Sequence, residues 1–307
     1  MSAPDVVCLA SWNADLVSRV VRPIARGETL LASAFDISPG GKGSNAAVAA
    51  ARQGARVAVI ARIGRDDFGR MALDLWSREG LDTTQVEQVD GERSGVAQIL
   101  VYDNGDNSIA VFPGAGAGLG PAHAEAATAT IASARVVMAP CEVPLAATTA
   151  AFRIARAHGV RTLLNPAPAR PLPDELVALC DLLTPNEGEL RALAGLGDDA
   201  PLADAAAALL QRGAGAVLVT LGADGACLFR PGAGPVHEAG WSMDVVDTIG
   251  AGDTCTGALA AALARGLPID AAMRHANAAA ALSVTGRGAI GAMPGRDAVA
   301  ALLATRG

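Results

Sequence analysis

The chain has 307 residues, of which 51% are hydrophobic and only 3% aromatic, and it carries a formal net charge of −7. This length and apolar content allow a large buried core, which excludes an intrinsically disordered protein. The acidic balance and the lack of a long basic run argue against nucleic acid or an anionic membrane as a partner.

Short β-rich runs alternate with helical patterns along most of the chain. Buried strands are predicted at 6–10, 57–63, 136–139, 160–164 and 216–221. Helices are predicted at 42–53, 67–79, 145–158, 187–193 and 202–212. This alternation predicts an α/β fold with a mainly parallel sheet that is covered by helices on both faces.

Residues 14–38 and 94–113 depart from this pattern, since they carry short strand-like pieces with little helical periodicity. The pieces at 96–102 and 108–112 flank Asp103-Asn104-Gly105-Asp106, which is a strong hairpin signal. We interpret the two segments as a small discontinuous β lid. Because no linker or repeat interrupts the sequence, we expect a single domain over residues 1–307.

The cysteines and the N-terminal residues indicate a reducing compartment. The five cysteines are far apart and form no C-x-x-C pair, which favours free thiols over disulfides or a zinc site. No basic-then-apolar leader precedes Asp5, so a secretion signal is not expected. The apolar stretches near 258–264 and 276–284 are Ala-rich and interrupted by charge, and they predict buried helices, not membrane spans. A cytoplasmic protein is therefore expected.

The run Gly250-Ala251-Gly252-Asp253 is the most informative motif. Small residues at the start of a helix leave backbone N–H groups free to face a ligand, and the helix dipole adds positive potential there. This predicts an anion hole with a carboxylate, Asp253, at its rim as a potential general base. The pairing suits a reaction in which a hydroxyl is deprotonated while negative charge builds on a phosphate.

Two earlier segments could form a pocket for a small polar ligand, but each also has a plain structural explanation. Gly40-Gly41-Lys42-Gly43-Ser44-Asn45 is not a Walker A loop, because Gly43 stands where that loop needs Ser or Thr. Its glycines could still let Lys42 and Asn45 approach a ligand, although a plain strand-to-helix turn fits equally well. Asn13 and Asp15 alternate after the first strand, where they could grip vicinal hydroxyls or form an ordinary polar turn.

Three further patterns are ambiguous when each is taken alone. Asn186 and Glu189 could load a helix start or face a phosphate and its Mg²⁺ through water. The turn at 220–225 could be a plain β-turn or the edge of a nucleotide site. Asp247, amid carbonyl-rich turns, could hold a monovalent cation.

The two glycine motifs, in this order, resemble those of the ribokinase family of carbohydrate kinases, the PfkB type. The early motif, Gly40 to Gly54, reads GGKGSNAAVAAARQG, and the late motif, Asp247 to Gly257, reads DTIGAGDTCTG. The segments 165–169 (NPAPA) and 184–187 (TPNE) add to a likeness that covers nearly the whole chain. The resemblance implies a ribokinase-like three-layer α/β/α body with a mainly parallel central sheet and a small β-sheet lid, often shared across a homodimer.

The resemblance also implies roles for individual residues. Besides Asp253 as the base, the residues that would bind or approach the sugar are Asn13, Asp15, Gly41, Lys42, Asn45, Ala97 and Glu142. The anion hole would be formed by the amides of Gly250, Ala251, Gly252 and Asp253. The ATP site would be lined by Asn186, Glu189, Thr220, Gly222, Gly225, Gly252 and Asn277. An activating K⁺ would be held by Asp247 and Ile249, with backbone near Ser283, Gly286, Gly288 and Ala292.

The activity implied by the resemblance is ATP-dependent phosphorylation of the primary hydroxyl of a small sugar, with D-ribose as the first choice. Mg²⁺ would be held mainly by the phosphates and by water near Glu189. Fructose, 2-deoxyribose and tagatose remain alternative acceptors. A nucleoside ranks lower because few aromatic side chains, mainly Trp12 and Phe112, could stack on a base. A sugar-binding regulatory protein on a kinase scaffold is the non-enzymatic alternative, against which the intact Asp253 and glycine turn argue.

Overall fold

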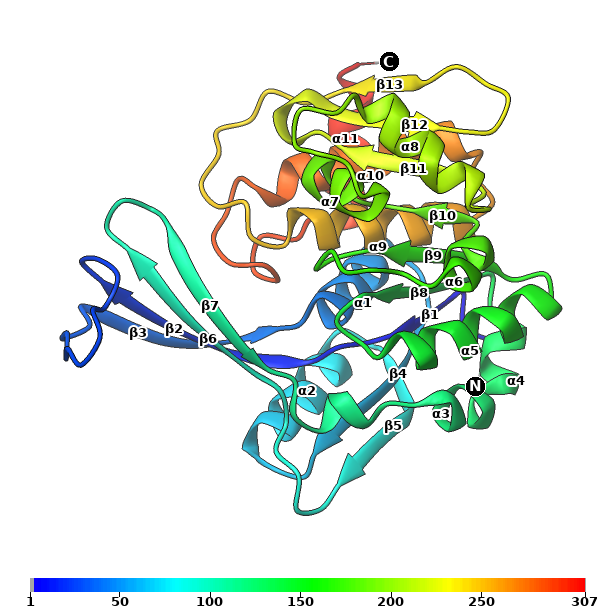
Figure 1. Ribbon diagram of the computed structural model, residues 1–307. Coiled ribbons are helices and arrows are strands. Elements are labelled where there is room, and N and C mark those ends of the chain that lie inside the picture. The colour runs from blue at the N-terminus through cyan, green and yellow to red at the C-terminus, as the bar shows by residue number, and fades with distance from the viewer. Residues whose placement is uncertain (1–2, 307) are drawn as a thin grey trace.

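The computed structural model describes residues 3–306 and contains two β-sheets (Figure 1). The larger sheet has nine strands in the order β13-β12-β11-β10-β9-β8-β1-β4-β5. Only β12 and β13 add to it in antiparallel fashion, which confirms the predicted mainly parallel sheet. Its strands are β1 Val6–Leu9, β4 Val57–Gly64, β5 Asp82–Val89, β8 Val136–Pro140, β9 Arg161–Asn165, β10 Leu182–Leu183, β11 Val217–Thr220, β12 Gly225–Phe229 and β13 Val236–Ala239.

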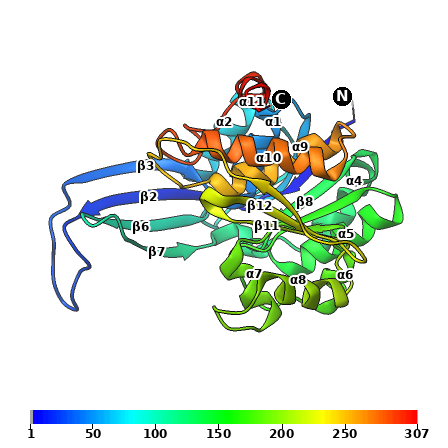
Figure 2. The same cartoon turned by 90° about the horizontal axis from the view of Figure 1, so that it is seen from above.

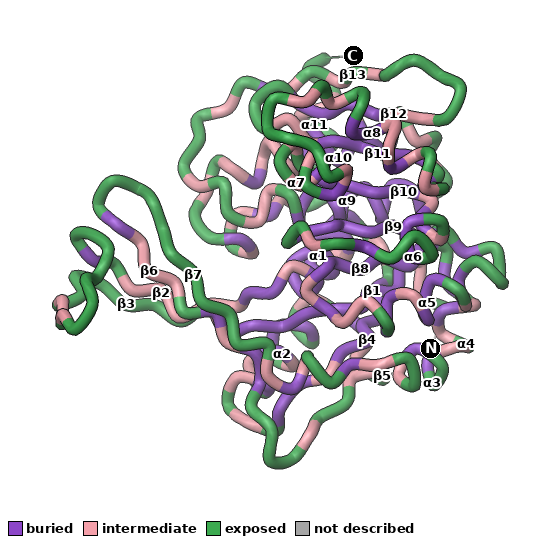
Figure 3. Tube along the Cα trace, in the orientation of Figure 1, coloured by how far each residue is buried: buried purple, intermediate pink, exposed green. Residues whose placement is uncertain are grey.

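Strand side chains alternate between two hydrophobic cores, one on each face of this sheet, and Figure 3 shows the buried residues concentrated there. In β1, Val6 and Cys8 face one core while Val7 and Leu9 face the other. The first core is covered by α1 Lys42–Arg52, α2 Asp67–Arg78, α9 Ala251–Ala264, α10 Ile269–Ser283 and α11 Arg296–Ala304. The second is covered by α3 Pro121–Ala126, α4 Thr128–Ser133, α5 Leu145–Ala157, α6 Asp174–Leu179, α7 Glu187–Ala194 and α8 Leu202–Gln211. This is the expected three-layer α/β/α body.

The smaller sheet projects from the body as an arm (Figures 1 and 2). Its strand order is β3-β2-β6-β7, and its bounds are β2 Asn13–Val20, β3 Ala34–Gly40, β6 Val96–Tyr102 and β7 Asn107–Phe112. The antiparallel β6–β7 pair confirms the hairpin, which closes with the Tyr102 N–H donating to the Asp106 carbonyl at 2.9 Å. The parallel β2–β6 pair joins the two segments that the sequence separates. That this sheet acts as a lid stays a prediction.

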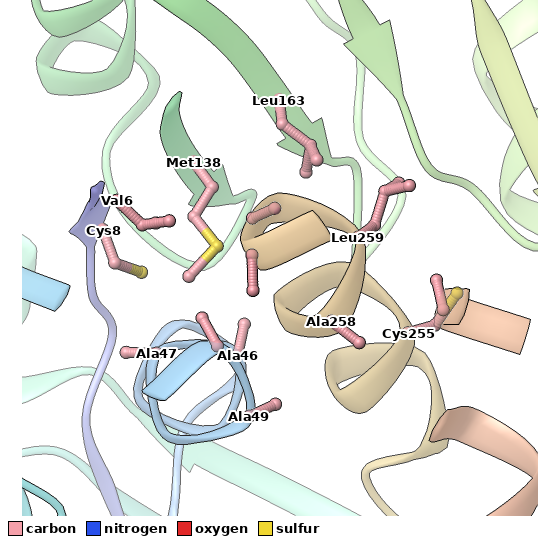
Figure 4. Packing of buried hydrophobic residues seen from close by; sticks show 14 of the residues in the cluster. Val6, Cys8, Ala46, Ala47, Ala49, Met138, Leu163, Cys255, Ala258 and Leu259 are labelled. Carbon is pink, nitrogen blue, oxygen red and sulfur yellow. The ribbon is translucent and has the colours of Figure 1, made fainter. Parts of the chain in front are cut away.

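Helices α1 and α9 cross at very short range because small residues meet at the crossing (Figure 4). A Cβ atom at Gly257 would lie 2.2 Å from the Ala46 carbonyl oxygen, so only glycine fits there. Ala46 and Ala49 of α1 face this part of α9. The close crossing fixes the two helix starts, at Lys42 and Ala251, relative to each other.

All five cysteines are buried and free, as expected. Between residues 3 and 306, no helix combines the length and the apolar character needed to cross a membrane.

Candidate active site

The starts of α1 and α9 meet at the carboxyl ends of the central strands. Asp253 lies in the first turn of α9 and is 5% exposed. The Asn45 side-chain amide, on the first turn of α1, donates to Asp253 Oδ2 at 2.9 Å. The early and late motifs therefore form one site, with the carboxylate held by a neutral donor and not packed into hydrocarbon.

The charges in this site set the protonation of Asp253. Burial raises the pKa of Asp253 to about 6, while the Lys42 ammonium and the Asn45 hydrogen bond act in the opposite direction. Burial alone would lower the pKa of Lys42, but the surrounding carboxylates, foremost Asp253 and Glu142, raise it overall. At neutral pH the site therefore holds an ionised carboxylate beside a charged ammonium, and the pKa of this carboxylate is close to the range that a general base needs.

Gly250 supplies the turn into α9 with φ 78°, a left-handed conformation that favours glycine. The Ala251 N–H already donates to the Thr248 carbonyl at 3.2 Å. Across the described part of the chain, no acceptor is found for the N–H groups of Gly250, Gly252 and Asp253. Of the four amides expected in the anion hole, these three are thus free to face a ligand, while that of Ala251 is engaged within the turn.

The residues expected on the sugar side lie together at the base of the arm. Asn13 is the first residue of β2 and is buried, and Asp15 stands opposite Ala97 of β6 in the strand register. The pKa of Asp15 is raised to about 7, chiefly by burial and then by the neighbouring carboxylates of Glu142 and Asp253, while Lys42 opposes this shift. The structure therefore places Asp15 beside the cluster of charges around Asp253. Gly41 directly precedes α1, where it is the N-cap residue.

Ser11 is a site residue that sequence reasoning missed. Its hydroxyl donates to Glu142 Oε2 at 2.6 Å and accepts from the Gly43 N–H at 2.9 Å. The same Glu142 oxygen accepts from the Lys42 N–H at 2.8 Å. Glu142, which was expected to bind sugar, thus also anchors the start of α1. A hydroxyl directly after a buried strand and two residues before Asn13 was the only available signal.

The expected ATP-site residues lie at the neighbouring strand ends. Asn186 and Glu189 form a capping box at the start of α7, each side chain accepting the other's backbone N–H. This is the structural role that the sequence left open, yet Glu189 also acts electrostatically on both Lys42 and Asp253. Asn186 bridges to Thr220 at the end of β11. Glu189 therefore lies close enough to influence the charges of Lys42 and Asp253 while it caps its own helix.

The other two parts of the expected ATP site lie further along this edge. Gly222 and Gly225 begin and end the turn between β11 and β12, and both have positive φ. Asn277 is buried on α10, and its amide donates to the Ala239 carbonyl at 2.9 Å. One donor of Asn277 is therefore already engaged with β13.

The expected cation residues lie in two loops that Asp247 joins. Its carboxylate accepts from the Ile249 N–H at 3.0 Å and from the Gly288 N–H at 2.9 Å. Ala292 packs against Gly286, and the Ala292 N–H donates to the Gly288 carbonyl at 3.4 Å. The Ser283 hydroxyl donates to the Ala280 carbonyl. In residues 3–306 no group of three acidic, His or Cys side chains could hold a metal. Asp247 therefore joins the two loops through their backbone N–H groups, and the K⁺ site stays a prediction.

Trp12 does not face the ligand. It is 4% exposed and packs edge-on against Trp76, with the ring centroids 5.8 Å apart. The interpretation of Trp12 as a stacking platform for a nucleoside base is therefore wrong, because Trp12, in the segment between β1 and β2, packs into the first core against Trp76. Phe112 of β7, the other candidate for stacking, is 57% exposed.

The fold and this site define a carbohydrate kinase: the chain belongs to the pfkB family of carbohydrate kinases, whose model matches residues 3–296. It is 40% identical to the ribokinase of Haemophilus influenzae, over 94% of this chain and 95% of that protein. It is 36% identical to the deoxyribokinase of Salmonella typhi, with coverage of 94% and 95%. Among solved structures, Arabidopsis thaliana ribokinase complexed with ribose and ATP matches with a TM-score of 0.92 and 32% identity, over 98% of this chain and 99% of that one.

Proposed function

We propose that this kinase transfers the γ-phosphoryl group of ATP to the primary hydroxyl of D-ribose, giving D-ribose 5-phosphate and ADP. The observation that carries the proposal is the contact between Asn45 and Asp253, which places a buried carboxylate beside Lys42 and at the rim of the α9 amides. The similarity to ribokinases over almost the full chain supports ribose as the acceptor.

Each group has a distinct task in the proposed reaction. Asp253 takes the proton from the primary hydroxyl as its oxygen attacks the γ-phosphorus, and the bond to the ADP oxygen breaks. The free amides of Gly250, Gly252 and Asp253 stabilise the charge that spreads over the transferring group. Asn13, Asp15 and the other polar groups at the base of the arm orient the sugar hydroxyls.

Two cations fit the donors that the structure offers. Mg²⁺ keeps several waters and binds through phosphates with one or two carboxylates, which suits Glu189 at the edge of the cluster; it would neutralise charge on the phosphates. K⁺ would use Asp247 and the carbonyls of the 283–292 segment, where its charge would steady the loop next to the anion hole. These residues would hold the cations, and the chemistry would stay with Asp253 and the amides.

A second acceptor, 2-deoxyribose, is favoured by one observation: a deoxyribokinase matches this chain with an identity close to that of the ribokinases. An ADP-release assay across ribose, 2-deoxyribose, fructose, tagatose and adenosine tests the choice. The highest kcat/KM is expected for ribose. A higher value for another acceptor would overturn the proposal. Ribose-dependent thermal stabilisation without turnover of any acceptor would instead indicate a binding protein.

We also propose that two copies of the chain associate through their arms. One face of the four-stranded sheet carries Val17, Ile99, Ile109 and Val111 in register with Asp15 and Ala97. Ile109 and Val111 are 55% and 53% exposed. An apolar sheet face of this kind is stabilised when a partner covers it, and a second copy would also enclose the sugar side of the site.

A further inference from the structure

The C-terminal end of α1 is hydrogen-bonded to residues 290–294, which follow α10. The Arg52 guanidinium, in the last turn of α1, donates through Nη1 to the carbonyls of Ile290 and Met293, at 2.7 and 3.0 Å. Its other donors, Nε and Nη2, form a bidentate pair with Glu79 at 3.0 and 2.6 Å. The neighbouring Gln53 donates to the Pro294 carbonyl at 2.8 Å. Residues 290–294 are thus fixed to α1 through their own backbone.

The segment held by Arg52 also contacts the turn that carries the expected anion hole. A Cβ atom at Gly250 would lie 2.7 Å from Ala289 Cβ, so the turn into α9 sits directly on Ala289. One residue earlier, the Gly288 N–H donates to Asp247. The segment held by Arg52 at 290–293 therefore continues without interruption into the residues that support 247–250.

We propose that Arg52 is a positioning residue for the anion hole. By holding two carbonyls of the 290–293 turn, it fixes Ala289 and Gly288, and these fix the turn that presents the amides of Gly250, Gly252 and Asp253. Arg52 touches no reacting atom. The inference uses the kinase activity of the family and does not depend on which sugar is the acceptor or on whether K⁺ binds.

This position has a specific kinetic consequence. The amides act most strongly on the charge that develops as the phosphoryl group transfers, so a shifted turn lowers kcat. Sugar binding uses Asn13, Asp15 and Asn45, near the opposite end of α1, and is expected to stay intact. Misplacement of a site by about 1 Å can cost up to ~100-fold in rate. A role limited to stability would lower the melting temperature without separating kcat from sugar affinity.

The test compares Arg52→Met with Arg52→Lys and Glu79→Gln. Arg52→Met should lower kcat by about 10- to 100-fold while the sugar dissociation constant, measured by calorimetry, stays at the wild-type value. Arg52→Lys keeps the charge but cannot reach both carbonyls with the same planar geometry. Its kcat should therefore fall between those of wild type and Arg52→Met. Glu79→Gln keeps Arg52 and a hydrogen-bond acceptor for it, and should retain kcat even where the melting temperature drops.

Two outcomes would overturn the proposal. Wild-type kcat in folded Arg52→Met or Arg52→Lys would show that the carbonyl contacts do not position the amides. An equal loss of kcat in Glu79→Gln would show that the Arg52–Glu79 ion pair, not the hydrogen bonds from Arg52 to the 290 and 293 carbonyls, sets the rate.

The thermal shift caused by KCl relative to choline chloride gives a separate readout. If the wild-type protein shows no such shift, the K⁺ proposal fails while the Arg52 proposal is still decided by kcat.

Discussion

The side-chain amide of Asn45 lies 2.9 Å from Oδ2 of Asp253, across 208 residues of sequence. This single hydrogen bond unites the glycine-rich start of α1 with the glycine turn that begins α9. It also stabilises the ionised form of the carboxylate, because an amide donor favours the charged acceptor. Burial opposes this effect, and the balance leaves the pKa of Asp253 at about 6.

The first prediction concerns the pH dependence of turnover. Since a base must be ionised to accept a proton, kcat at saturating sugar should fall as the pH drops through about 6, the pKa of Asp253. In Asn45→Ala the lost hydrogen bond raises the pKa of Asp253, so the acidic limb of the profile should move to higher pH. A limb that stays in place in this variant would contradict the role of the contact. Initial rates across the acidic range, with ATP and sugar saturating, give the measurement.

The second prediction is that Asp253→Asn separates activity from stability. Loss of the base should lower kcat at least ~100-fold. The pKa of Asp253 is raised in the folded state above its ordinary value of 3.8, so the group favours folding below that value and opposes it once the pH rises through about 6. Asn cannot ionise, and the variant should therefore melt at a higher temperature than wild type at about pH 8.

The comparison of melting temperatures at low pH is the internal control for Asp253→Asn. Where the aspartate is protonated in both states, the difference between the variant and wild type should shrink. Near wild-type kcat in a folded variant would remove Asp253 from its assigned role. A melting temperature below that of wild type at alkaline pH would show that the carboxylate is stabilised by its neighbours more than burial destabilises it.

The third prediction concerns Ser11, whose hydroxyl bridges Glu142 and the buried Gly43 N–H. Ser11→Ala leaves that N–H without its acceptor, which costs about 1–3 kcal/mol of folding free energy. Because the start of α1 carries Lys42 and Asn45, the KM for sugar should also rise. Denaturant unfolding and steady-state kinetics measure the two effects. Ser18→Ala, on the neighbouring strand β2, is the control and should change neither the unfolding free energy nor the KM for sugar. An unchanged KM in Ser11→Ala would contradict a positioning role.

The sequence predicted those parts of the fold and site that depend on local pattern. Alternating apolar runs give the buried strands, and the glycine turn before Asp253 gives the start of α9, although the helix begins at Ala251, ahead of the apolar run from 258. Strand β5 was missed because it lies at the sheet edge and is only partly buried, so its polar residues hide the pattern. That Lys42, Asn45 and Asp253 belong to one site was implied by the family resemblance of the two motifs, and the Asn45–Asp253 contact brings them together.

Side-chain contacts between segments far apart in the chain could not be predicted from the sequence. Ser11 meets Glu142 across 131 residues, and nothing in either local pattern marks the other as its partner. Trp12 was a candidate for stacking on a nucleoside base because the chain has few aromatic residues, whereas the structure packs it against Trp76 of α2 in the core. Arg52 reads as an ordinary last-turn basic residue, yet its acceptors lie 238 and 241 residues away.

The last prediction tests association through the arm. Ile109 and Ala110 are exposed neighbours on β7 whose side chains point to opposite faces of the four-stranded sheet. Ile109→Lys places a charge on the face that carries Val17 and Val111, and burying an unpaired ammonium against a partner is costly. Light scattering should therefore show a dimer for wild type and a monomer for Ile109→Lys. Ala110→Lys adds the same charge to the other face and should remain dimeric. A monomeric wild-type protein at micromolar concentration, or equal dissociation by both variants, would contradict this interface.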